Sequence, residues 1–159
     1  MELVRSKLNL NLFLISLLIP LFVGLLCIAL IRQSALSFSQ LVLPPFALPL
    51  PVSGILWGIL YFAMGISFYM VARTACEETP MALSLYVVQL FFNVVWCILF
   101  FALESYFPAF ITAVLLACLV LLMLAWFLRV HWIAGLIQLP YTLWVLYWAI
   151  LSLGIYLFN

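Results

Sequence analysis

Long apolar stretches, separated by short polar or charged breaks, dominate this sequence. A bilayer core of about 30 Å takes about 20 apolar residues in helical form, so stretches of this length predict membrane-spanning helices. We place these helices at about residues 10–31, 52–72, 81–102, 108–128 and 133–157. The pattern therefore predicts an all-α membrane protein, a five-transmembrane-helix bundle that forms one domain over residues 1–159.

The composition excludes most other classes of protein. Hydrophobic residues make up 71% of the chain and charged residues 6%, which is too little polar surface to cover a water-soluble globule. A β-barrel would alternate apolar and polar positions, whereas these stretches are continuously apolar. A nucleic-acid partner would require a basic patch, and the net charge is only +1. The composition predicts membrane lipid as the main partner.

The positive side chains predict an orientation in the membrane. With this number of crossings, Arg5, Lys7, Arg73 and Arg129 fall on one side, and only Arg32 falls on the other. Because Lys and Arg concentrate in cytoplasmic segments, we expect the N-terminus in the cytoplasm and the C-terminus outside. We expect the membrane to be a bacterial cell membrane.

The first connection, residues 32–51, differs from the other links between helices. It is too long for a tight turn and contains four prolines, each of which lacks an N–H donor and disfavours helical geometry in the residue before it. Long ordered loops in compact proteins are often functional. We expect this segment to form a lid over a site between the helices.

Two of the predicted helices carry an aromatic face. Trp57 and Tyr61 are four residues apart in the second helix, and Tyr141, Trp144 and Trp148 recur at similar spacing in the fifth. Such faces form a wall suited to a flat, apolar ligand.

Glycines flank the aromatic face of the second helix. Gly54, Gly58 and Gly65 carry no side chain, so we expect neighbouring helices to approach closely there. The spacing of Gly54 and Gly58 also fits a homodimer contact, although close packing within the bundle explains it equally well.

Amide side chains inside the third helix have two interpretations. Gln89 and Asn93 are one turn apart, and Trp96 lies on nearly the same face. Because an unpaired amide in hydrocarbon is costly, both should point into the bundle. They either join helices through hydrogen bonds, which is common in membrane bundles, or bind the polar end of a ligand.

Several functions require residues that the predicted helices lack. No charged residue lies near a helix centre, which argues against ion pumps, proton-coupled carriers and voltage sensors. No paired carboxylates or Ser/His/Asp set lies within the membrane, so hydrolysis lacks its acid–base groups. The four cysteines show no metal-binding spacing, and we interpret Cys27, Cys97 and Cys118 as packing residues.

Three groups of residues, in chain order, resemble motifs of the translocator protein family, also called tryptophan-rich sensory proteins. The resemblance spans most of the chain, from the first loop to the fifth helix. The matching positions are Pro44, Pro45, Pro49, Gly54, Trp57, Leu60, Tyr61, Met64 and Gly65, then Gln89, Asn93, Trp96, Phe100 and Phe101, and finally Leu139, Pro140, Tyr141 and Trp144.

The resemblance implies a pocket between the helices, beneath the first loop, for porphyrins such as protoporphyrin IX or related tetrapyrroles, with no other cofactor required. Together with the aromatic faces, it makes the candidate ligand-binding residues Phe46, Trp57, Tyr61, Gln89, Asn93, Trp96, Tyr141, Trp144 and Trp148. We expect the rings of Trp57 and Trp144 to face each other across this pocket. Compared with the family pattern, Phe46 replaces a tryptophan, Trp148 an alanine and Ser152 an asparagine.

Three functions follow from these expectations. The first is a receptor or sensor that binds a porphyrin or another planar apolar molecule. The second is a light-dependent porphyrin-degrading enzyme, with Trp57 and Trp144 as the catalytic residues, since the resemblance implies such chemistry for some bacterial relatives. The third is a porphyrin or lipid transporter, which the lack of coupling charges makes the weaker alternative.

Overall fold

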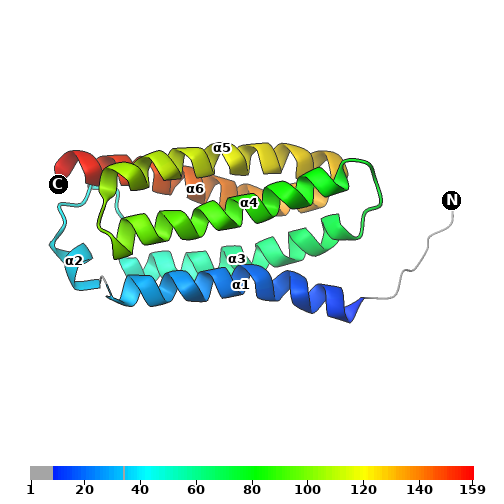
Figure 1. The fold of residues 1–159 in the computed structure, drawn as a ribbon, viewed down its shortest axis with the longest axis horizontal. Coiled ribbons are helices and arrows are strands. Elements are labelled where there is room, and N and C mark those ends of the chain that lie inside the picture. The colour runs from blue at the N-terminus through cyan, green and yellow to red at the C-terminus, as the bar shows by residue number, and fades with distance from the viewer. Residues whose placement is uncertain (1–8, 34) are drawn as a thin grey trace.

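The computed structural model describes residues 9–33 and 35–159 and forms a bundle of long helices (Figure 1). Its elements are α1 (Leu10–Gln33), α2 (Ala35–Gln40), α3 (Leu50–Ala72), α4 (Thr79–Cys97), the π-helix η1 (Ile98–Ala102), α5 (Tyr106–Val130) and α6 (Trp132–Phe158). Five segments are long and apolar enough to cross a membrane, with η1 extending α4. The predicted five-helix membrane bundle is confirmed, and every predicted helix end lies within two residues of its observed position.

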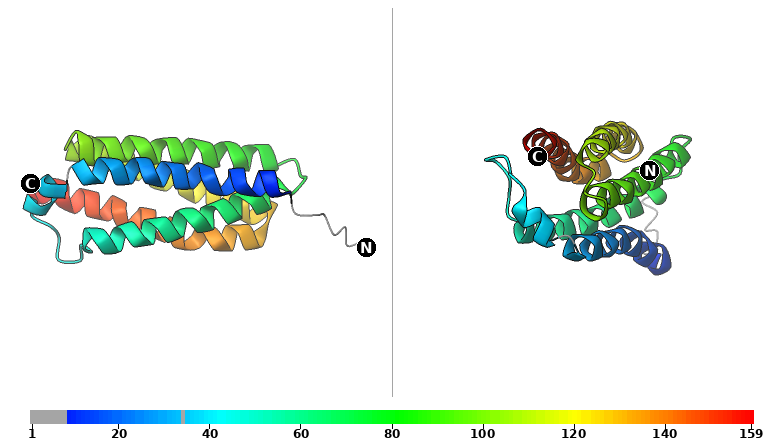
Figure 2. Two further views of the ribbon diagram at one scale, coloured as in Figure 1. Left: turned by 90° about the horizontal axis from the view of Figure 1, so that it is seen from below. Right: turned by 60° about the vertical axis from the view of Figure 1, so that its left-hand side comes forward.

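The helices run up and down along one common direction (Figures 1 and 2). In the bundle α5 lies against α4 and α6, and α3 lies against α1 and α6. The chain between α1 and α3, the turn after η1 and the C-terminus share one end, which we call the loop end (Figure 1). The α3–α4 and α5–α6 links share the opposite end with the start of α1 (Figure 1).

The arginines are divided between the two ends as predicted from the topology. Arg73 caps the C-terminus of α3 and Arg129 lies in the last turn of α5, both at the end opposite the loop end. Arg32 lies in the last turn of α1, at the loop end. Arg5 and Lys7 lie outside the described residues. Which end faces the cytoplasm therefore stays a prediction.

Local sequence explains where several helices begin. Both α3 and α4 start with a proline at one of their first two positions, where a missing N–H leaves no helical bond unmade. The start of α6 is capped by His131, whose Nδ1 accepts a hydrogen bond from the Ala134 N–H at 3.4 Å.

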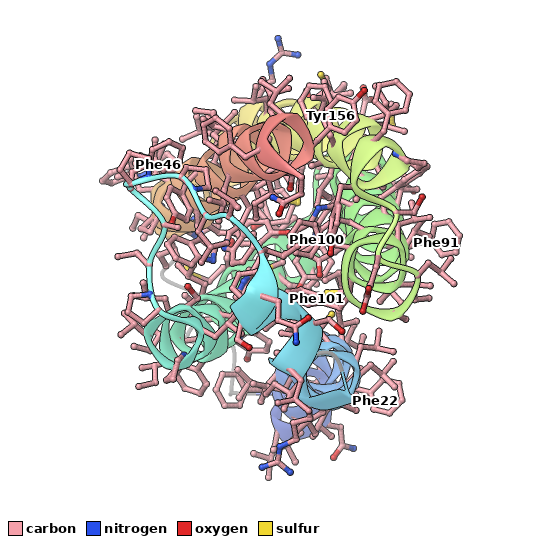
Figure 3. The ribbon with its side chains drawn as sticks, turned by 90° about the vertical axis from the view of Figure 1, so that its left-hand side faces the viewer. Phe22, Phe46, Phe91, Phe100, Phe101 and Tyr156 are labelled. Carbon is pink, nitrogen blue, oxygen red and sulfur yellow. The ribbon has the colours of Figure 1, made fainter. Side chains whose placement is uncertain are left out.

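The core at the loop end is aromatic, and the π-helix contributes two of its rings. Phe100 and Phe101 are adjacent in η1, both are buried, and their ring centroids lie 4.8 Å apart. Figure 3 shows both rings near the middle of the bundle, close to α2, whereas Phe22 and Phe91 lie on its outer surface. These outer residues are more than half exposed, which suits a surface that contacts lipid.

The loop before α3 is attached to α6. Asn159 holds Val42 with two hydrogen bonds, accepting from its N–H at 2.9 Å and donating to its carbonyl at 3.1 Å. The Tyr147 hydroxyl accepts from the Leu48 N–H at 3.0 Å and donates to the Phe46 carbonyl at 3.3 Å. Tyr147 in α6 and Asn159, which caps this helix, therefore fix the position of this loop.

Candidate functional site

A cavity of about 310 Å³ lies between α1 and α3, in the half of the bundle nearer the loop end. Residues from α4, η1 and α6 form the wall opposite the α1–α3 gap. The lining residues are Leu21, Gly24, Leu25, Cys27, Ile28, Ile31, Leu50, Ser53, Gly54, Trp57, Gly58, Tyr61, Trp96, Cys97, Phe101 and Trp148. The surface they provide is almost entirely apolar, as in most small-molecule sites.

The cavity exists because α1 and α3 diverge toward the loop end. Farther from it, a Cβ built on Gly65 would lie 2.8 Å from the Leu17 Cα, so the two helices touch there. At Gly54 and Gly58 no described atom lies within 4 Å of such a Cβ. The expected close approach therefore occurs at Gly65, whereas for Gly54 and Gly58 the expectation of close packing within the bundle is wrong because these two glycines line the open space.

Aromatic rings form part of the cavity wall. The rings of Trp57 and Tyr61 stack with 5.3 Å between centroids and an interplanar angle of 27°. The Trp96 ring lies next to that of Trp57, with 6.4 Å between centroids, and meets Trp148 edge to face at 5.2 Å. The Trp96 indole N–H donates to the Ser152 Oγ at 3.3 Å, which fixes the ring's orientation. Four of the predicted ligand-binding residues therefore line one cavity.

Behind this wall lies a buried polar cluster that joins α3, α4 and α6. The Tyr61 hydroxyl donates to the Asn93 Oδ1 at 2.7 Å, and the Asn93 Nδ2 donates to the Tyr141 hydroxyl at 3.5 Å. The Tyr141 hydroxyl donates to the Gln89 Oε1 at 2.6 Å. Asn93, Gln89 and Tyr141 do not line the cavity. These bonds favour the interpretation that the two amides join helices.

The structure places Trp144 behind Trp57, away from the cavity. Their ring centroids are 6.3 Å apart and the rings meet edge to face at 76°, so no space separates them. The prediction that the two rings face each other across the pocket is wrong, because the cavity lies between α3 and α1, on the other side of Trp57. The Trp144 indole N–H is buried and has no hydrogen-bond partner among the described residues.

Phe46 does not line the cavity. Its ring lies at the outer edge of the loop (Figure 3), is 48% exposed and meets the Tyr147 ring edge to face at 6.3 Å. Within the described part of the predicted 32–51 lid, only Leu50 lines the cavity. A role for this loop as a lid stays a prediction.

Sequence reasoning missed the contribution of α1. This helix supplies Leu25, Cys27 and Ile28 to the cavity wall. Its sequence is apolar all round, so no periodicity marks the face that points inward. The sequence predicts that Cys27 and Cys97 are packing residues, and the structure shows that both also line the cavity. Within the described part of the chain, no three His, Cys, Asp or Glu side chains group to hold a metal ion.

Comparison with known proteins agrees with this architecture. The model of the TspO/MBR family matches residues 16–157. A tryptophan-rich protein TspO from Archaeoglobus fulgidus is 31% identical over 116 residues, which cover 73% of this chain and 75% of that protein. Protein CrtK from Rhodobacter capsulatus is 28% identical over 124 residues, which cover 77% of this chain and 78% of that protein. A tryptophan-rich protein TspO from Chlorobaculum tepidum is 29% identical over 130 residues, which cover 80% of this chain and 82% of that protein.

The match therefore spans α3 to α6 and most of α1, including every cavity-lining residue. The chain is an integral membrane protein with five membrane-spanning helices among its described residues, and it belongs to the TspO/MBR family.

Proposed function

We propose that this protein is a membrane receptor or sensor that binds a porphyrin, or a similar planar apolar molecule, in the cavity between α1 and α3. The observation that carries the proposal is the cavity itself, whose walls present the rings of Trp57, Tyr61, Trp96 and Trp148. Burial in the cavity and stacking on the rings of Trp57 and Tyr61 would supply most of the affinity.

The shape of the cavity suggests how such a molecule binds. A volume of about 310 Å³ is at the small end for ligand sites. We therefore propose that one edge of the tetrapyrrole enters the cavity, while the rest of the ring lies along the apolar outer faces of α1 and α3. Leu25, Ile28 and Gly58 line the cavity and are exposed, so its opening is on the outer surface of the bundle.

Arg32 is a suitable partner for the acidic groups of a porphyrin. It follows Ile31, which lines the cavity, and it is exposed in the last turn of α1. A propionate carboxylate of protoporphyrin IX that projects from the cavity toward the loop end would meet this guanidinium.

Titration with protoporphyrin IX in lipid nanodiscs tests the proposal. We expect saturable quenching of tryptophan fluorescence, because the ligand would stack on indole rings. The matched control is the Gly58→Leu variant, in which the new side chain occupies the cavity. Quenching that is unsaturable, or that is the same in both proteins, would contradict the proposal.

One observation favours photochemical breakdown of a bound porphyrin as a second candidate function. Trp57 lies on the cavity wall and Trp144 contacts it from behind. An indole can give an electron to an excited porphyrin stacked on it, and Trp144 could then reduce the oxidised Trp57 ring. Illumination in air should yield a new absorbing product, which Trp57→Phe and Trp144→Phe lose and the exposed-site control Trp132→Phe keeps. Unchanged product formation in the first two variants would exclude this function.

A further inference from the structure

Two thiols from different helices lie on the wall of one cavity. Cys27 belongs to α1 and Cys97 ends α4, and these two helices contact each other directly. Both side chains line the cavity, are at most 5% exposed and are free thiols. Both residues belong to one cluster of buried side chains at the loop end of the bundle. This juxtaposition plays no part in the binding proposed above.

The groups around Cys27 can support a thiolate. Its thiol lies 3.8 Å from the Asn93 Oδ1, an oxygen that also accepts a bond from the Tyr61 hydroxyl. Tyr61 lines the same cavity as Cys27. If Cys27 loses its proton, the Tyr61 hydroxyl, which shares the Asn93 oxygen with it, can turn toward the charged sulfur. Since the thiolate is the nucleophilic form of cysteine, Cys27 is the better placed of the two to attack a substrate.

The cavity gives the thiols a route to the lipid. Buried cysteines are inert when nothing can reach them. Here the same cavity is lined by Leu25, Ile28 and Gly58, which are exposed on the apolar outer surface. An apolar molecule in the bilayer can therefore reach the sulfurs without crossing a polar layer.

We propose that Cys27 and Cys97 form a redox pair that reduces an organic hydroperoxide arriving from the bilayer and closes to a disulfide. The Cys27 sulfur attacks the peroxide oxygen, the O–O bond breaks, and the thiol proton passes to the departing oxygen, which leaves as an alcohol. The Cys97 sulfur then attacks the Cys27 sulfenic acid, an S–S bond forms, and water leaves. In sum, two thiols and one hydroperoxide give one disulfide, one alcohol and one water. The disulfide would tie α1 to α4 beside the cavity.

The test uses the full chain in lipid nanodiscs with the two other cysteines replaced. Cys76 and Cys118 are exposed and do not line the cavity, so the Cys76→Ser/Cys118→Ser protein keeps only the pair. With cumene hydroperoxide we expect the intact mass to fall by two hydrogens. We also expect a peptide that joins α1 to α4, and both changes should reverse with dithiothreitol. Hydrogen peroxide at equal concentration should react more slowly, because it arrives from water. Faster reaction with hydrogen peroxide would overturn the assigned bilayer route.

Trapping the sulfenic acid identifies the attacking thiol and keeps the proposal falsifiable if one variant folds poorly. With dimedone present, the added Cys97→Ser change should leave an adduct on Cys27, whereas the added Cys27→Ser change should leave Cys97 unmodified. Protoporphyrin titration of the same samples monitors the binding site separately. Two thiols that both remain free for alkylation after denaturation, or that oxidise separately without a cross-link, would overturn the proposal.

Discussion

The Trp57 ring separates the cavity from Trp144: it lines the cavity on one side, and on the other its centroid lies 6.3 Å from that of Trp144. A bound molecule can therefore touch Trp57 directly and reach Trp144 only through it. Trp57 and Trp144 both match tryptophans of the family motifs, yet this relationship assigns them different roles.

Gly58→Leu should remove ligand binding with little loss of stability. A Cβ at this position meets no described atom within 4 Å, and leucine is a better helix former than glycine. We expect protoporphyrin affinity to fall by about tenfold or more, equivalent to about 1.4 kcal/mol. Gly65→Ala is the contrasting change, because its Cβ would clash with Leu17 and should lower the melting temperature. Equal binding by Gly58→Leu and the parent would contradict the assigned cavity.

Arg32→Gln should weaken binding only of porphyrins that carry carboxylates. An ion pair at an exposed guanidinium contributes about 0.5 to 1 kcal/mol, so we expect affinity for protoporphyrin IX to fall by about twofold to fivefold. Etioporphyrin, which lacks carboxylates, should bind both proteins alike. Fluorescence titration at low and high salt measures the difference, which high salt should reduce. An equal loss of affinity for both porphyrins would rule out the ion pair.

Tyr141→Phe should destabilise the bundle without changing the lining of the cavity. The lost hydroxyl leaves the Gln89 Oε1 and the Asn93 Nδ2 without the bonds they now make. We expect a cost of about 1 to 2 kcal/mol, measured as a lower melting temperature. Tyr86→Phe is the matched control, because the buried Tyr86 hydroxyl has no partner among the described residues and its removal should cost nothing. Equal losses of stability in both variants would show that the hydrogen bonds of Tyr141 do not stabilise the bundle.

Trp148→Ala should enlarge the cavity. The Trp148 ring is buried and lines the cavity, where it also meets Trp96. Removing it should cost about 3 to 5 kcal/mol of stability, as for other large buried rings, and should let a porphyrin enter farther and bind more tightly. Trp132→Ala, at a site that is 63% exposed, serves as the control. Weaker binding by a folded Trp148→Ala protein would mean that this ring holds the ligand.

The two attachments of the first loop should be separable by hydrogen exchange. Asn159→Ala should speed exchange of the Val42 amide and leave the Leu48 amide protected, because different residues hold these two donors. Tyr147→Phe should do the reverse. Each variant is therefore the control for the other, measured by exchange with mass spectrometry. Simultaneous loss of protection at both amides in either variant would mean that the loop is released as one unit.

The sequence predicts the helices well and the cavity poorly, for a physical reason. Helix ends follow from lengths of apolar sequence and from prolines such as Pro80, which are local properties. The inward position of Gln89 and Asn93 also follows from local chemistry, because buried amides need partners. The position of the cavity depends instead on the angle between the axes of α1 and α3, which no single residue sets.

Two particular misses show the same limit. The π-helix η1 brings Phe100 and Phe101 together at the loop end, and no glycine or proline marks it within Ile98–Ala102. Cys27 lies in a helix that is apolar on every side, so only the three-dimensional structure shows that it lines the same cavity as Cys97. Both depend on how the helices pack, and local sequence does not determine that packing.

The divergence of α1 from α3 has a consequence for how affinity is measured. A compound that reaches the gap from among the acyl chains is at equilibrium with its concentration in lipid, which partitioning raises far above that in water. The apparent dissociation constant, expressed per volume of buffer, will therefore rise with the amount of lipid or detergent in the sample. Affinities for this protein become comparable once they are expressed as mole fractions of the membrane phase.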